Sequence, residues 1–97
     1  MKPFILSNST RQDKRYMVKT DDKTIHFGSP DHDNYIIHKD AKRKDSYINR
    51  HSKTEDWTKQ GIYTAGFWSR WLLWEKPSLF EAINNIEKKF NIKIVIP

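Results

Sequence analysis

The sequence contains no cysteine, and this absence removes several classes of protein at once. A chain without thiols cannot be a disulfide-stapled scaffold, a zinc finger or an iron–sulfur protein. Glycine is also scarce, with 3 residues in 97, and none of them belongs to a glycine-rich phosphate-binding loop. No Ser-His-Asp arrangement or nucleophile elbow is visible. We therefore predict no catalytic residue, no bound metal and no cofactor.

Long apolar runs are absent as well. The N-terminus carries one short run, Phe4–Leu6, before polar sequence resumes. A secretion signal needs about 7–15 apolar residues, and a membrane span needs about 20. We therefore expect a soluble chain that is neither secreted nor inserted in a membrane.

The length of 97 residues limits the chain to one modest core, because folding hides only about 60–65% of the surface of such a chain. Hydrophobic residues make up 36% and aromatic residues 13%, including four tryptophans. Disordered chains are poor in aromatic residues. We expect a single α+β domain over residues 1–97, with residues 1–13 as an N-terminal arm.

The first half of the chain has the patterns of a hairpin and two helices. Residues 15–19 and 24–27 partly alternate like paired strands, and a polar turn joins them. Asp40 is a helix cap, and the helix that it starts extends to about Ser52. A second helical start lies at residues 54–57.

The second half predicts a helix followed by a strand. Ser78 and Glu81 form a capping box, in which the serine hydroxyl accepts from the third amide and the glutamate reaches back to the serine amide. The apolar positions that follow have helical spacing. Residues 92–96 alternate as a strand should, and we expect this strand to pair with the hairpin. The predicted fold is thus a β-hairpin, two or three helices and a C-terminal strand.

Aromatic side chains gather in one block, residues 67–74, which is apolar nearly all round. Such a block is either the core of the domain or a surface that docks on a partner. The core is the default interpretation, and the enrichment of tryptophan and arginine at binding hot spots supports the second. The candidate partner-binding residues are Trp57, Phe67, Trp68, Arg70, Trp71 and Trp74.

Positive charge gathers in a different segment, residues 39–53. The chain has a net charge of +6, and this segment holds six bases and two acids. A basic helix face can follow nucleic-acid phosphates, although a solvated helix explains the same charges. The candidate nucleic-acid-binding residues are Lys39, Lys42, Arg43, Lys44, Arg50 and Lys53. The basic residues of the arm that could assist them are Lys2, Arg11, Lys14 and Arg15.

Histidines next to carboxylates suggest a remote alternative. An acid–histidine segment around His32, followed by Asn49 and His51 on a helix, loosely resembles the ββα-metal (HNH-like) nucleases. In those enzymes a histidine activates water while the helix residue holds the cation. The spacing here fixes no carboxylate partner for a metal, so surface polar loops are the default interpretation.

Residues 14–90 also carry a distinctive pattern. Its most specific part is Thr64–Trp74, Thr-Ala-Gly-Phe-Trp-Ser-Arg-Trp-Leu-Leu-Trp, which follows His26-Phe27-Gly28 and His38-Lys39-Asp40. The pattern is similar to a family of short uncharacterised proteins encoded by large eukaryotic DNA viruses and by some tailed phages. This resemblance implies an origin in a viral genome and a place in the virion or the host cell. It implies no mechanism.

Three functions follow from these observations. The first is a non-enzymatic virion component, a minor capsid or internal protein whose indole-rich block docks on a viral structural protein. The second is a nucleic-acid-binding protein that uses residues 39–53, and the third, remote function is a metal-dependent nuclease. The accessibility of the indoles separates the first two: hidden indoles favour the basic helix, and displayed indoles favour a protein partner.

Overall fold

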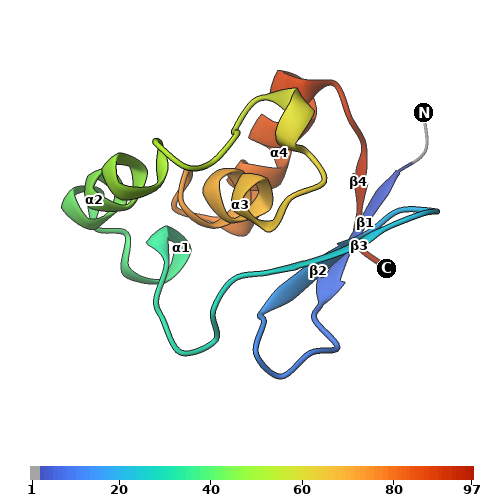
Figure 1. The fold of residues 1–97 in the computed structure, drawn as a ribbon, viewed down its shortest axis with the longest axis horizontal. Coiled ribbons are helices and arrows are strands. Elements are labelled where there is room, and N and C mark those ends of the chain that lie inside the picture. The colour runs from blue at the N-terminus through green and yellow to red at the C-terminus, as the bar shows by residue number, and fades with distance from the viewer. Residues whose placement is uncertain (1–2) are drawn as a thin grey trace.

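The computed structural model describes residues 3–97, in which a four-stranded sheet carries the helical part of the molecule on one face (Figure 1). The strands, in the spatial order β3-β2-β1-β4, are β1 (Phe4–Asn8), β2 (Tyr16–Lys19), β3 (Thr24–Phe27) and β4 (Ile94–Val95). The helical elements are α1 (Tyr35–His38), α2 (Ala41–His51), the 3-10 turn η1 (Lys59–Gly61), α3 (Ala65–Trp68), the π-helix η2 (Ser69–Leu73) and α4 (Leu79–Phe90). The α+β class is confirmed.

The predicted hairpin is present. Strands β2 and β3 pair antiparallel, with Tyr16 opposite Phe27 and Lys19 opposite Thr24. The amide of Thr20 donates to the carbonyl of Lys23 at 2.8 Å and closes the turn. Ile25 and Phe27 of β3 and Val18 of β2 are buried, so one face of the hairpin packs into the core.

The prediction of an N-terminal arm is wrong for residues 4–8, which form strand β1. Phe4 and Leu6 are 7% and 2% exposed, and Leu6 lies opposite Val18 of β2. The short apolar run therefore fills an edge that the hairpin alone would leave open. Strand β4 pairs in parallel with β1, and not with the hairpin as predicted, because β1 lies between them.

Both long helices begin at the predicted caps. The carboxylate of Asp40 accepts from the amide of Lys42 at 2.9 Å at the start of α2. The hydroxyl of Ser78 accepts from the amide of Glu81 at 3.2 Å at the start of α4. The carboxylate of Glu81 accepts from the Ser78 hydroxyl, and not from the serine amide as a full capping box requires.

The segment around residues 54–57 does not start a helix. Asp56 accepts from both the amide and the hydroxyl of Thr58, at 2.9 and 2.6 Å. Such local side-chain bonds compete with helix formation, and regular structure resumes only at η1. The aromatic block begins earlier than predicted, where Thr64 caps α3, and it continues as the π-helix η2.

The core lies between the sheet and the helices α3, η2 and α4. Trp68 is its centre: the side chain has no exposed surface, and its ring lies 5.5 Å from Phe4 and 6.3 Å from Phe27. The apolar side of α4 completes this core with Ile86 and Phe90. Among the described helices, none is long and apolar enough to cross a membrane.

The burial of β1 predicts a stability effect that an arm would not have. We expect Leu6→Ala to lower the free energy of unfolding by about 2–4 kcal/mol, because a buried leucine leaves a cavity. Asn8→Ala, at an exposed position of the same strand, should change it by less than about 0.5 kcal/mol. Urea denaturation measures both variants. Equal, small effects would contradict the placement of β1.

Candidate functional site

The aromatic block belongs mainly to the core, which corrects the partner-binding prediction for Phe67 and Trp68. Both residues are 0% exposed. The indole nitrogen of Trp68 donates to the carbonyl of Ile62 at 2.7 Å, so even its polar atom is used internally. Neither side chain has any surface left with which to contact a partner in this fold.

Arg70 is also an internal residue, 9% exposed. Its guanidinium carbon lies 5.3 Å from the ring centre of Trp57 and 4.5 Å from that of Trp71. The indole nitrogen of Trp71 donates to the carbonyl of Trp57 at 2.9 Å. These half-buried indoles clamp the arginine within the domain, and its predicted role in partner binding is therefore replaced by a structural one.

The charge of Arg70 is neutralised by Glu75. The guanidinium donates to the carboxylate at 2.8 Å, and the ammonium of Lys44 lies 3.4 Å from the same oxygen. Lys44 also donates to the backbone carbonyl of Glu75 at 2.8 Å. Lys44 is thus tied into the body of the protein, which corrects its assignment as a free phosphate contact.

A second contact joins α2 to the block. The rings of Tyr47 and Trp74 stack with centroids 4.3 Å apart and planes only 3° from parallel. His51 lies near the tyrosine ring at 4.4 Å. Trp74 is half-buried, and the stack occupies one face of its ring.

The other cations of the basic segment remain available. Lys42, Arg43, Arg50 and Lys53 are exposed, and none forms an ion pair within residues 3–97. Lys39 is exposed too, but its ammonium donates to the carbonyl of Ile36. Helix α2 therefore turns Lys44 inward and its remaining charges outward.

A cleft of about 680 Å³ lies beside α2, and some of these exposed cations line it. One wall is the loop after β3, residues 28–34, and the facing wall is α2. The third wall comes from α3 and η2. Residues from four separate parts of the sequence thus meet around one opening, which no motif in the sequence announced.

The rim of the cleft carries more positive than negative charge, because three basic residues and one exposed acid, Asp33, line it. Arg43 and Arg50 line it from α2, and Lys14 lines it from the connection between β1 and β2. Arg15 does not contribute, because its guanidinium donates to the carbonyls of Ser29, Pro30 and His32 at 3.0–3.3 Å and fixes the loop.

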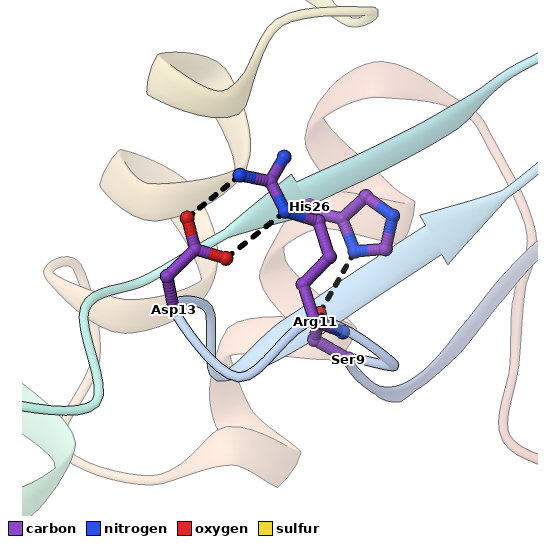
Figure 2. A network of polar contacts seen from close by, with 4 residues as sticks. All are labelled: Ser9, Arg11, Asp13 and His26. Atoms are coloured by element: carbon purple, nitrogen blue, oxygen red, sulfur yellow. Dashed lines mark hydrogen bonds and ion pairs between the residues drawn. The ribbon is translucent and has the colours of Figure 1, made fainter.

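Arg11, another cation of the predicted arm, does not line the cleft. Arg11 forms a two-pronged pair with Asp13, at 3.0 and 2.6 Å (Figure 2), and this hydrogen bond holds the pKa of the Asp13 carboxyl below its ordinary value. Ser9 and His26 form a separate contact at 2.8 Å beside this pair. Lys2 lies outside the described residues. Of the four predicted arm cations, the described structure places Lys14 alone at the candidate site.

Polar groups without partners line the inside of the cleft. Asn34 is 5% exposed; its side-chain oxygen accepts from the amide of Ile37, and its amide nitrogen has no hydrogen bond within the described chain. The hydroxyl of Tyr47, a residue 8% exposed, likewise makes none. Burial, with a smaller contribution from the charge of Glu55, raises the pKa of Tyr47 to about 12, so the phenol keeps its proton at neutral pH.

Glu55 is the acidic group on the inner wall, and Gly66 sets its position. A Cβ atom at residue 66 would lie 1.3 Å from a carboxylate oxygen of Glu55. The carboxylate makes no ion pair with any residue in the range 3–97. A glycine within the aromatic block therefore makes room for an unpaired acid.

The structure brings together only part of the arrangement expected for a nuclease. His32 lines the cleft and contacts the hydroxyl of Ser29 at 2.9 Å, whereas Asn49 is exposed and does not line it. His51 lines the same cleft and lies against Tyr47. Among residues 3–97, no three His, Asp or Glu side chains converge in a metal-binding arrangement.

Comparison with known proteins adds one finding. Residues 4–51 are similar to a family of unknown function, DUF5754. This segment comprises β1 to α2, and so it includes the basic helix and the loop that forms one wall of the cleft. The motif Thr64–Trp74, which contains the aromatic block, lies beyond it. No curated protein and no solved structure matches the chain.

The Glu75 ion pairs make stability depend on pH. Burial alone would raise the pKa of Glu75, but the hydrogen bond and charge of Arg70, together with the charge of Lys44, bring it below its ordinary value. A lowered pKa means that Glu75 stabilises the fold above about pH 4.5, and that this contribution is lost as the pH falls through the folded-state pKa.

We therefore expect Glu75→Gln to lower the free energy of unfolding by about 1.5–3 kcal/mol at neutral pH, as the loss of a hydrogen bond between charged groups does. The difference from the wild type should shrink towards about pH 3. Asp45→Asn, at an exposed position that forms no ion pair within residues 3–97, is the control. A difference that stays constant between these pH values contradicts the assignment.

Proposed function

We propose that this protein binds nucleic acid through the phosphate backbone, with α2 as the main contact, and that it catalyses no reaction. The observation that carries the proposal is the division of cations on α2. Lys44 faces inward to Glu75, whereas Lys42, Arg43, Arg50 and Lys53 are exposed without ion pairs within the described chain. Unpaired cations on one rigid element are suited to displace the counterions of a polyanion.

The spacing on the helix supports contacts to more than one phosphate. Arg43 and Arg50 are seven residues apart, so they project from the same side of α2 about 10 Å apart along its axis. Lys14 faces them from the other side of the cleft. A strand that followed this opening would meet positive charge on both sides.

The burial of Phe67, Trp68 and Arg70 favours this function over docking on a protein, although the other three indoles are only half-buried. A hot spot needs an accessible anchor, and Phe67, Trp68 and Arg70 are internal. The resemblance to virus-encoded proteins supplies a biological setting. In that setting the proposed role is to accompany a viral genome in the virion or the infected cell.

The proposal predicts a change in the salt dependence of binding. Replacing Arg43 and Arg50 together by alanine should weaken binding to a single DNA strand, and should reduce the slope of log affinity against log salt by about 1.4, since each lost phosphate contact accounts for about 0.7 on a single strand. Fluorescence anisotropy at several salt concentrations measures both quantities.

The matched control is Lys88→Ala with Lys93→Ala, which also removes two positive charges, from exposed positions in α4 and in the turn after it. We expect a much smaller change in slope for this control. Identical changes for the two pairs would mean that binding follows net charge alone. A wild-type protein with no measurable affinity would overturn the proposal.

A further inference from the structure

We propose that the cleft beside α2 receives one unpaired nucleotide of a bound strand, with the base inside and its phosphates on the cationic rim. The base is one that carries an exocyclic amino group, adenine, cytosine or guanine. This inference rests on the proposed function and deepens it, because it names the form of nucleic acid and the part of it that is recognised. The volume of the cleft is suitable for a nucleotide, since ligand sites typically measure about 300–1,000 Å³.

The exposure of the lining residues separates the rim from the interior. Arg43 and Arg50 are exposed, whereas Asn34 and Tyr47 are nearly buried. The polar ends of these two side chains are not among the fully buried atoms of the described chain that lack a partner. The amide of Asn34 and the hydroxyl of Tyr47 therefore reach the cleft that both residues line, where they are available to hydrogen-bond with a ligand.

The acid on the inner wall decides what kind of group enters. A phosphate beside the unpaired carboxylate of Glu55 would be repelled, so the anionic part of the ligand belongs outside with the arginines. A carboxylate is an acceptor only, and it pairs well with the amino group of a base. The interior thus offers donors from Asn34 and Tyr47 beside an acceptor from Glu55, which is the mixture found along the edge of a nucleobase.

The backbone at Gly66 leaves room for the carboxylate of Glu55 at the position where the base would bind. The missing side chain of Gly66 leaves the space that the carboxylate occupies. Ser69, one turn further along, adds a hydroxyl to the same wall.

The position of these groups also selects against a duplex. In a double helix the amino groups of the bases are paired and stacked, so a base can reach an enclosed pocket only from a single strand or by flipping out. We therefore expect single strands to bind more tightly than a duplex of the same sequence.

The test compares short single strands of oligo(dC) and oligo(dT) by fluorescence anisotropy, because thymine lacks the amino group. We expect oligo(dC) to bind about tenfold more tightly, the value of one hydrogen bond to a charged acceptor. Glu55→Ala should remove this preference by weakening oligo(dC) binding. Asp45→Ala is the matched control, since it removes the same charge from an exposed site outside the cleft.

The sign of the effect makes the test decisive. If the strand binds by charge alone, removal of either acid strengthens the binding of every strand. Equal strengthening by Glu55→Ala and Asp45→Ala, without a preference for oligo(dC), overturns the inference and leaves the role of Arg43 and Arg50 intact. If Glu55→Ala proves unstable, Tyr47→Phe replaces it: the ring stack on Trp74 is kept, and oligo(dC) should bind about three- to tenfold more weakly. Unchanged binding by Tyr47→Phe then overturns the inference.

Titrations with free CMP and with inorganic phosphate distinguish recognition of the base from recognition of a phosphate alone. We expect CMP to shift the amide resonances around Asn34, Tyr47 and Glu55, and phosphate to shift those near the rim alone. The same shifts from both overturn the inference. Shifts from CMP in a protein that binds no strand would show that the cleft takes a free nucleotide, which keeps the base site and refutes the proposed function.

Discussion

The attachment of α2 to the aromatic block is the constraint on which the rest of the structure depends. Tyr47 is the one fully buried residue of this helix within the described chain, and it stacks on Trp74. Lys44, one turn away, meets Glu75, which in turn pairs with Arg70. These two contacts fix both the height of the helix above the core and its rotation. The rotation determines which cations face water, and the height leaves the cleft between α2 and the loop after β3.

The tryptophans therefore act on function from inside the fold. A chain of this size gains little from a core of small aliphatic residues, and large rings bury much surface for each residue that is ordered. Trp68 fills the centre of the core, while Trp57 and Trp71 hold Arg70 between them. The arginine then presents its charge to Glu75. The aromatic block thereby positions the basic helix, and it also supplies one wall of the cleft beside that helix.

Sequence patterns predicted the elements whose causes are local. The caps Asp40 and Ser78 fixed the starts of two helices, and alternation fixed the hairpin. Strand β1 escaped prediction because five residues with one apolar run look like an arm until the open edge of the hairpin is known. The cleft escaped for a related reason. Lys14, Asn34 and Glu55 are far apart along the chain, and only tertiary packing brings them together.

The predicted binding residues also divide into those that local patterns identify and those whose role depends on tertiary packing. Local charge patterning identified Arg43 and Arg50 as candidates, but nothing in the sequence distinguished Lys44 from its neighbours, because its partner Glu75 lies outside the helix. Gly66 was a readable signal: a glycine inside an otherwise bulky block indicates that another group approaches the backbone closely. The sequence could not say that this group is Glu55.

The most direct test of the account is a map of the bound state by amide chemical shifts, recorded while a single-stranded DNA is added to the unmodified protein. The account predicts that the changes gather on α2, on the loop after β3 and around Gly66, and that α4 and the uncovered face of the sheet stay unchanged. Changes centred on the sheet or on α4, with α2 unaffected, would contradict it.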